Sequence, residues 1–376
     1  MKRSIILGVL IASAAIPATA QGQTRTIYSS LPLSGPASTQ TKAVNDGARQ
    51  ALQEAGGMAG GQAIKFVTLN DATKRAGSWV PELVARNARR AAQDDSTLAI
   101  LGPFNSGAAA VMIPITNEAG VPVISPSNTA IGLTTDGPGA NPGEPDKYYP
   151  TGERTYFRIM PNDQVQADAL ATAMRDAGCK RIGSVHDGET YGKGMGTLMR
   201  RSAARLGMKV ASTTRIRRGT RRFSSIKGDC IAYTGITANG ATRMFNRVSR
   251  KAKLFGSDGV AESGFTDHIS ASVAKRMTVT VSTLAPSAYP GGASFANADP
   301  YKLYGYEVMK LILDGANAAG ATKEALLGWL RTGVQNRASV LGTYSLDANG
   351  DTTLRSYGLY GVKGRNLVFN GAITAA

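Results

Sequence analysis

The sequence predicts an α/β protein of two lobes, each built around a doubly wound parallel sheet. Short β-rich runs alternate with helical patterns from Thr26 to Ser125, and the alternation resumes from Tyr156 to Thr283. A Gly/Pro-rich stretch, Thr134–Gly152, separates the two series. Strands that alternate with helices are typical of βαβ units and of parallel sheets. A chain of 376 residues is long enough to bury a core in each of two lobes.

The first series opens with a strand and a helix that a Gly/Pro loop separates. The helical pattern Lys42–Ala55 repeats apolar residues at helical spacing, and Gly56 with Gly57 predicts where it ends. The other expected elements are strands at Thr26–Leu33, Ile64–Leu69, Leu98–Leu101 and Val121–Ser125, and helices at Trp79–Gln93 and Ala108–Ala119.

The second series follows the same pattern and is then succeeded by helices and an antiparallel tail. We expect strands at Tyr156–Ile159, Arg181–His186, Lys209–Ile216, Cys230–Tyr233, Lys253–Phe255 and Met277–Thr283, and helices at Gln164–Ala177, Lys193–Leu206 and Ala238–Ser249. Two long helices, Tyr301–Ala319 and Lys323–Thr332, come next. The tail Gly342–Phe369 contains the predicted turn Asp347–Asp351.

The N-terminus has the pattern of a secretory signal peptide. Lys2 and Arg3 precede the apolar run Ile5–Ile16, and Ala18-Thr19-Ala20 supplies a small-residue cleavage site. We therefore expect residues 1–20 to be removed after Ala20, which places the mature chain in the periplasm or outside the cell. The alternative is an uncleaved anchor.

The chain is strongly basic, with a formal net charge of +17. Five arginines cluster between Arg215 and Arg222, which is one pattern of a nucleic-acid surface. Export and the lack of interleaved aromatic residues favour a solvated basic face instead. We expect no nucleic-acid partner, and a steep salt dependence of binding would indicate the opposite.

Signatures of an enzyme are sparse. The only histidines are His186 and His268, and nucleophile elbows, metal-spaced Cys/His pairs and phosphate-binding loops do not occur. The glycines of Gly192–Gly196 lack dinucleotide-site spacing. We expect no catalytic residues, no metal and no cofactor. An exported hydrolase is the alternative, and it would need His186 as its general base.

Polar residues recur where the predicted strands end. Ligands bind at the carboxyl ends of the strands in doubly wound sheets, and small hydroxylated residues with free N–H groups at helix starts suit a carboxylate. These strand ends are Leu31–Pro36, Gly102–Gly107, Ser125–Thr129, His186–Gly192, Thr234-Gly235 and Gly256–Gly259.

These segments, in this order, resemble the leucine/isoleucine/valine-binding family of type I periplasmic binding proteins. The matching stretches include Pro32–Pro36, Asn45–Ala48, Ile100–Pro103, Ala119–Pro126, Phe157-Arg158, His186-Asp187 with Tyr191-Gly192, and Ser257–Gly259. The resemblance covers nearly the whole mature chain.

The resemblance implies a binding site between the lobes. It places Ser106, Ser127 and Thr129 around a ligand carboxylate and sets Asp258 against a ligand ammonium, while Tyr191 and the backbone around Thr234 close from the second lobe. Gln40 would face the ligand side chain, and its amide argues against a purely aliphatic ligand.

The resemblance also implies how the chain is divided and what it does. Lobe I would comprise residues 21–157 and 285–340, and lobe II residues 158–284 and 341–376, joined by three crossovers near Arg158, Leu284 and Leu341. The expected function is capture of an amino acid or related carboxylate by a monomer, with delivery to the membrane permease of an ABC transporter. A sensory protein that reports to a membrane receptor is the alternative.

The two cysteines are placed to form a disulfide. Cys179 precedes the strand Arg181–His186, and Cys230 opens the strand Cys230–Tyr233. In a sheet of flavodoxin-like order, these first and third strands of a lobe are parallel neighbours about 4.8 Å apart, within the reach of a disulfide. Export favours the bond. Two separate buried thiols remain the alternative.

Overall fold

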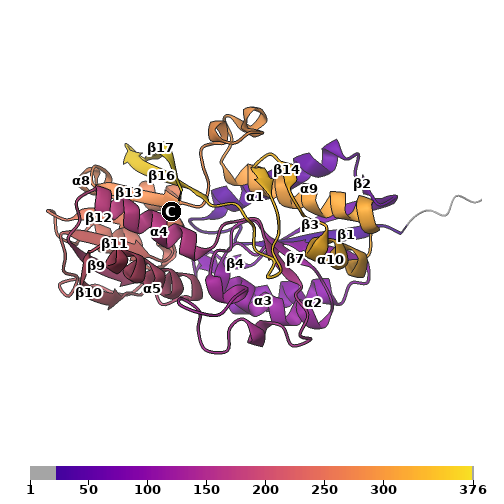
Figure 1. Ribbon diagram of the computed structural model, residues 1–376, viewed down its shortest axis with the longest axis horizontal. Helices are drawn as coiled ribbons and strands as arrows, with labels where there is room; N and C mark the ends of the chain where they lie inside the picture. The colour runs from indigo at the N-terminus through magenta and orange to yellow at the C-terminus, as the bar shows by residue number, and fades with distance from the viewer. Residues whose placement is uncertain (1–22, 375–376) are drawn as a thin grey trace, which may run out of the picture.

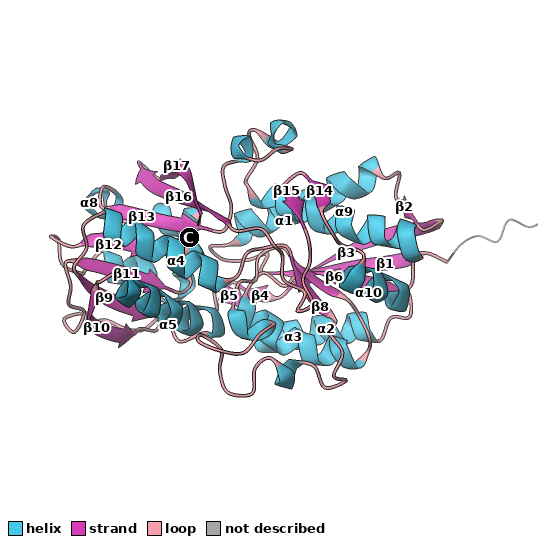
Figure 2. Ribbon diagram, in the orientation of Figure 1, coloured by secondary structure: helices cyan, strands magenta, loops and turns pink. Residues whose placement is uncertain are grey.

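The computed structural model describes residues 23–374, so the predicted signal peptide and its cleavage site lie outside the described residues. The molecule is elongated and has two lobes side by side, each with a central sheet covered by helices (Figures 1 and 2). The predicted fold class is confirmed. Within residues 23–374, none of the helices combines the length and the apolar character that a membrane span requires.

The sheet of lobe I has the strand order β2-β3-β1-β6-β7-β8. Its strands pair in parallel, except that β2 and β3 form an antiparallel hairpin. β1 and β6 are buried almost throughout, as expected of central strands covered on both faces, and β6 is correspondingly apolar apart from Thr97. The strands are β1 (Arg25–Leu31), β2 (Met58–Ala59), β3 (Gln62–Asn70), β6 (Thr97–Leu101), β7 (Val123–Ser125) and β8 (Tyr156–Arg158).

Helices cover both faces of the lobe I sheet and build two hydrophobic cores. One core involves α1 (Ser38–Glu54), α9 (Tyr301–Ala319) and α10 (Lys323–Thr332). The other involves α2 (Pro81–Ala92) and α3 (Ser106–Glu118). The C-terminal helices thus return to pack on the N-terminal sheet, as the resemblance implied.

Two glycines allow α1 and α9 to touch backbone to backbone. A Cβ atom at Gly47 would lie 1.9 Å from the carbonyl oxygen of Lys302, and one at Gly305 would lie 1.9 Å from that of Val44. Neither distance is tolerable, so any larger residue would force the helices apart. This close crossing ties the two distant segments of lobe I together.

The sheet of lobe II has the order β10-β9-β11-β12-β13-β16-β17. The first five strands are parallel, and β16 and β17 add an antiparallel hairpin. The strands are β9 (Arg181–His186), β10 (Lys209–Arg215), β11 (Cys230–Thr234), β12 (Lys253–Gly256), β13 (Met277–Val281), β16 (Ser356–Lys363) and β17 (Asn366–Thr374).

Helices also cover both faces of the lobe II sheet. One face carries α4 (Asp163–Asp176) and α5 (Thr190–Arg205), and the other carries the short helices α6 (Ala241–Phe245), α7 (Ser263–Thr266) and α8 (Ala271–Ala274). The predicted helix Ala238–Ser249 is wrong in extent. Gly240 adopts a left-handed φ of 102° between a 3₁₀ turn and α6, which breaks the helical hydrogen bonding.

The predicted neighbouring strands β9 and β11 do pair in parallel, and a disulfide joins the cysteines beside them. Cys179 and Cys230 are bonded, with their Cα atoms 5.8 Å apart. Both residues are buried at the edge of the sheet where the strands begin. The bond therefore lies at the opposite end of the strands from the residues at their carboxyl ends.

The crossover between the lobes is held by a buried ion pair. Arg158 at the end of β8 is fully buried, and its Nε and Nη2 donate to Asp351 Oδ1 and Oδ2 over 2.8 and 2.9 Å. Asp351 belongs to the predicted turn Asp347–Asp351, which the hydrogen bond from Gly350 N to Asp347 O (3.0 Å) closes. The turn therefore links the third crossover, which precedes Asp351, to the first crossover at Arg158.

The predicted third boundary, at residue 341, comes too early. β15 (Gly342–Tyr344) pairs with β14 (Arg337–Ser339), and Tyr344 and Leu346 are buried in the lobe I core beside α9. Lobe I therefore extends to Leu346, because the apolar side chains of this segment fill the core of the N-terminal sheet. A further small hairpin, β4 (Ala72–Thr73) with β5 (Ser78–Trp79), faces the cleft side of lobe I.

Candidate functional site

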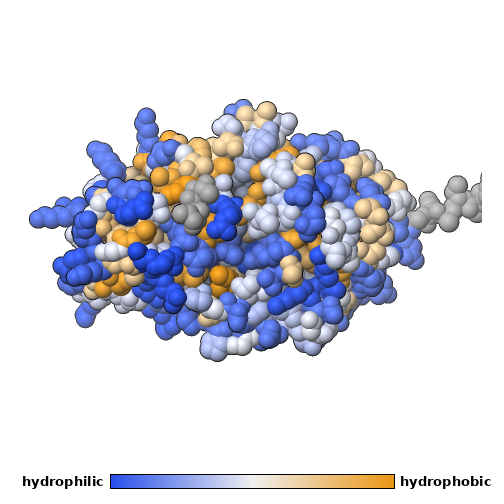
Figure 3. Space-filling model, viewed as in Figure 1, coloured by the Kyte–Doolittle hydropathy of each residue, from blue (hydrophilic) through white to orange (hydrophobic). Residues whose placement is uncertain are grey.

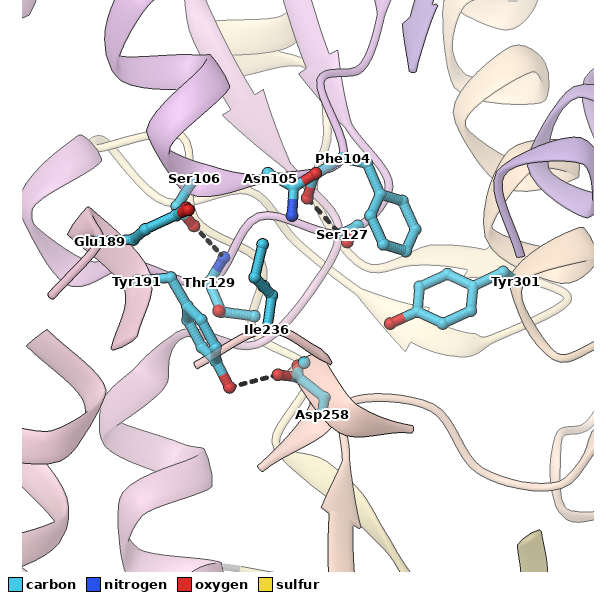
Figure 4. A pocket seen from close by; sticks show the side chains of 11 residues that line it. Phe104, Asn105, Ser106, Ser127, Thr129, Glu189, Tyr191, Ile236, Asp258 and Tyr301 are labelled. Carbon is cyan, nitrogen blue, oxygen red and sulfur yellow. Dashed lines mark hydrogen bonds between the residues drawn. The ribbon is translucent and has the colours of Figure 1, made fainter. Parts of the chain in front are cut away.

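A pocket lies between the lobes at the carboxyl ends of both sheets, and we call it the main pocket. Its empty volume is about 410 Å³ including the open mouth. Lobe I contributes the loop before α3, the loop after β7 and the start of α9, and lobe II contributes the start of α5 and the loops after β11 and β12. The lining residues are Phe104, Asn105, Ser106, Ser127, Thr129, Glu189, Tyr191, Ile236, Asp258, Gly259 and Tyr301 (Figure 4).

The lobe I wall offers hydrogen-bond donors. Ser106 is the first residue of α3, where the backbone N–H groups of the first turn have no partners inside the helix. Its Oγ accepts from the N–H groups of Thr129 (3.4 Å) and Ala130 (3.2 Å). Because both bonds use the oxygen as acceptor, the hydroxyl hydrogen of Ser106 remains available to a ligand. Ser127 Oγ donates to Phe104 O over 3.0 Å, which fixes the two loops against each other.

The lobe II wall is acidic. Tyr191 in α5 donates its hydroxyl hydrogen to Asp258, which follows β12, and Figure 4 shows the two side chains directed at each other. Tyr191 Oη also lies 3.3 Å from Gln166 Oε1. Burial raises the pKa of Asp258, although the hydrogen bond from Tyr191 opposes that shift. A cation beside Asp258 would replace the water that this carboxylate has lost.

Glu189 is a second carboxylate in the same wall. Its Oε1 accepts from Asn239 Nδ2 over 2.8 Å, and its Oε2 accepts from Trp79 Nε1 of lobe I over 3.3 Å. Burial, and then the negative charge of Asp187, raises its pKa to about 7. Within the part of the chain that the structure describes, no Lys, Arg or His lines the main pocket to balance either acid.

A smaller cavity adjoins the main pocket, and we call it the side pocket. It has Phe104, Asn105, Ile236, Asp258 and Gly259 in common with the main pocket. Gln40 in α1 lines the side pocket and not the main pocket, and its Nε2 donates to Ala261 O across the lobes over 2.7 Å.

Five of the seven residues that the resemblance placed at the site therefore meet in the main pocket. Thr234 does not. Its side chain is fully buried, and its Oγ1 donates to Gly192 O over 2.8 Å, which holds α5 on the sheet behind the pocket. Ile236, two residues further along, reaches the pocket instead.

Sequence reasoning missed several lining residues. Glu189 lies within a strand end that the sequence singled out, and its acidic side chain was a usable signal. Tyr301 gave no such signal because it begins a helix that follows a crossover. Its ring lies 5.1 Å from that of Phe104 (centroid distance), and Figure 4 shows its hydroxyl directed into the pocket.

Two α/β lobes, three crossovers and a polar pocket at the facing strand ends define a two-lobed solute-binding protein. The profile of the periplasmic binding protein family matches residues 29–228, and this chain belongs to that family.

The chain is similar over most of its length to binding proteins of known sequence or structure. The Leu/Ile/Val-binding protein BraC3 of Rhizobium johnstonii is 23% identical over 96% of this chain and 97% of its own. A leucine-binding protein LivK from Thermotoga maritima superposes with a TM-score of 0.77 at 22% identity, covering 93% of this chain and 99% of that one. The solute-binding protein of an ABC transporter from Rhodopseudomonas palustris, solved with 3,4-dihydroxybenzoic acid, has a TM-score of 0.74 at 15% identity, covering 94% and 98%. The resemblance to branched-chain amino-acid-binding proteins is thereby confirmed.

Proposed function

We propose that this protein binds an amino acid in the main pocket and delivers it to the membrane permease of an ABC transporter. The observation that carries the proposal is the contrast across the pocket: Asp258 with Tyr191 faces the donors around Ser106, and no basic side chain from residues 23–374 lines the pocket. The donors suit a carboxylate, and the acid suits an ammonium. Only a ligand with both groups satisfies the two walls together.

An aromatic carboxylate is the second candidate. It is favoured by the tilted ring pair Phe104–Tyr301 in the pocket wall and by the dihydroxybenzoate complex of the structurally similar protein. A purely anionic ligand would, however, lie against Asp258 and Glu189 with no basic side chain among the described lining residues, which is electrostatically unfavourable.

Isothermal titration calorimetry separates the two candidates. The twenty amino acids would be titrated in groups into the purified mature protein, with benzoate and 4-hydroxybenzoate as comparison ligands. We expect at least one amino acid to bind at micromolar concentration or better and the benzoates not to bind. Binding of a benzoate alone would overturn the amino-acid proposal.

Export, the monomeric state and the transporter partner belong to the same proposal. The signal-like residues 1–20 support secretion with a mature N-terminus at Gln21. Intact-mass analysis of the secreted protein tests the cleavage site, and light scattering on the same sample tests the monomer. Ligand uptake in a strain that lacks the gene tests transport. Unchanged uptake together with a lost response to the ligand would favour the sensory alternative.

Ligand delivery also requires the lobes to open and close. Several contacts across the cleft hold the lobes together, including those from Gln40 Nε2 to Ala261 O (2.7 Å) and from Arg218 Nη1 to Arg75 O (2.6 Å). Arg218 belongs to the basic cluster Arg215–Arg222. In this proposal the ligand biases the lobes toward this closed arrangement, because its two ends bind different lobes.

A further inference from the structure

A third carboxylate, Glu262, borders the space between the lobes. It immediately precedes α7 and lines the side pocket together with Gln40 and Asp258. The side pocket has an empty volume of about 390 Å³ including its opening. Gln40 and Glu262 also line a larger cavity, which shares Tyr301 with the main pocket. Because Asp258 and Glu262 line the same cavity, the side pocket is a path from the ammonium site at Asp258 toward Glu262.

Glu262 is buried without a full set of partners. The residue is 7% exposed, and its Oε2 accepts no hydrogen bond from any described residue. Burial raises its pKa to about 7. No Lys, Arg or His from the described chain lines the side pocket. In its ionised form, a carboxylate buried in this position is poorly stabilised unless a cation or a hydrogen-bond donor lies beside it.

Glu262 differs in this respect from the other two acids of the cleft. Glu189 already accepts hydrogen bonds at both of its oxygens, from Asn239 and Trp79. In the proposed function, Asp258 receives the ammonium of the ligand. An amino acid with an uncharged side chain would then satisfy Asp258 and the lobe I donors and leave Glu262 unpaired.

Gln40 adds to the polarity of the same cavity. Its Nε2 donates to Ala261 O, which leaves its Oε1 as an acceptor. Gln40 and Glu262 both line the side pocket, and a carboxylate with an amide oxygen in the same cavity suits an ammonium group better than a methyl group.

We propose that the ligand carries a second cationic group on its side chain and that Glu262, with Gln40, receives it. The ligand class is a dibasic amino acid with a flexible chain, such as lysine or ornithine. This inference rests on the proposed function, since it takes the site of the backbone ammonium and carboxylate from there.

The experiment compares L-lysine with L-norleucine, which has the same carbon chain without the terminal ammonium. Calorimetry on the mature wild-type protein at pH 7.5 should show lysine or ornithine binding at least tenfold more tightly than norleucine. Glu262→Gln keeps the shape of the side chain but removes its charge, and it should bring the affinity ratio close to one. Asp267→Asn removes the same charge from an exposed position five residues away and should leave the ratio unchanged.

The possible failures are distinguishable. Equal or tighter binding of norleucine in the wild type would overturn the second cation while leaving an amino-acid ligand in place. A preference for lysine that survives in Glu262→Gln would overturn the role of Glu262. Binding of no amino acid by a protein with a native circular dichroism spectrum would overturn the proposed function as well. The wild-type comparison decides the ligand class even if Glu262→Gln does not fold.

Discussion

The two walls of the cleft come from lobes of the same construction but differ in their chemistry. Lobe I presents hydroxyl and N–H groups around Ser106 and Thr129, and none of its side chains that line the main pocket is charged. Lobe II presents Glu189 and Asp258 in the main pocket and Glu262 in the side pocket. Loops at the carboxyl ends of both sheets line the cleft, but the loops of lobe I suit an anion and those of lobe II suit a cation.

This difference shows how a pocket between two lobes can require both ends of a zwitterion. A ligand that carries only one charge satisfies one wall and leaves the other desolvated without a partner. The face of the molecule in Figure 3 is mostly hydrophilic, with apolar residues in separate patches. The charge asymmetry of the cleft is thus a local feature of a broadly polar and basic protein.

The largest effect on ligand affinity should come from removing Asp258 from the lobe II wall. Asp258→Ala leaves the bound ammonium without its carboxylate, and breaking a buried pair in this way costs about 3–5 kcal/mol. Calorimetry with the best amino-acid ligand should therefore show affinity reduced by a factor of at least a hundred. An affinity within threefold of wild type would move the ammonium site away from Asp258.

The next prediction concerns the stability of lobe II, which contains a disulfide bond. The disulfide Cys179–Cys230 lies wholly within lobe II, and the chain has no other cysteine. With a sequence separation of 51 between the cysteines, the chain-entropy relation gives a stabilisation of about 4 kcal/mol. Reduction should lower the unfolding temperature of lobe II, as followed by calorimetry with and without a reductant.

Thiol counting provides the control for that prediction. Denatured secreted protein that has not been reduced should contain no free thiol. Two free thiols per chain would contradict the disulfide.

A smaller, pH-dependent effect should come from Asp163, which lies behind the lobe II wall. Asp163 is fully buried at the start of α4, and neither carboxylate oxygen has a hydrogen-bond partner among the described residues. Burial, and then the negative charge of Asp258, raises its pKa to about 8. The folded state then binds a proton at Asp163 more tightly than the unfolded state does. The free energy of unfolding therefore falls as the pH rises from about 4 to 8.

Asp163→Asn removes the ionisable group and with it the loss of stability at high pH. The variant should unfold at a higher temperature than wild type at pH 8.5, by roughly 2–4 °C for each kcal/mol recovered. At pH 4.5 the difference should be much smaller, because Asp163 is protonated in the folded protein there. An equal difference at both values would indicate that the ionisation of Asp163 is not responsible.

The walls also differ in how well the sequence predicted them. Strand ends are readable from sequence, because a β-rich run followed by Gly, Ser or Asn marks the edge where parallel strands deliver their loops. Ser106, Ser127, Thr129 and Asp258 lie in such segments and do meet in the main pocket.

The residues that were missed depend on packing between segments distant in the sequence. Tyr301 reaches the pocket because α9 crosses back to lobe I, and the backbone contact at Gly47 and Gly305 that fixes this crossing leaves no periodic signal. The backbone around Thr234 was expected to close the cleft, but the Thr234 side chain bonds to Gly192 of α5, and Ile236 of the same loop lines the pocket. Periodicity predicts elements, whereas such contacts are set by tertiary structure.

The smallest effect should come from the lobe I wall. Ser106→Ala removes one hydroxyl donor from the carboxylate site, while the N–H groups of the α3 first turn remain. A single hydrogen bond contributes about 0.5–1.5 kcal/mol, so the affinity should fall roughly fivefold. The N–H groups of Thr129 and Ala130 also lose their acceptor, so the circular dichroism spectrum of the variant serves as the control for folding. A loss as large as that of Asp258→Ala would mean that the walls do not differ as described.

The most direct measurement uses three matched ligands on the wild-type protein. Calorimetry would compare the best-binding L-amino acid with the amine that lacks its carboxylate and with the acid that lacks its ammonium. If the ligand bridges a donor wall and an acidic wall, the amino acid should bind at least a hundredfold more tightly than either fragment, and the amine should bind better than the acid. An acid that binds as tightly as the amino acid would contradict the account, because nothing in the lobe II wall would then be needed to receive a cation.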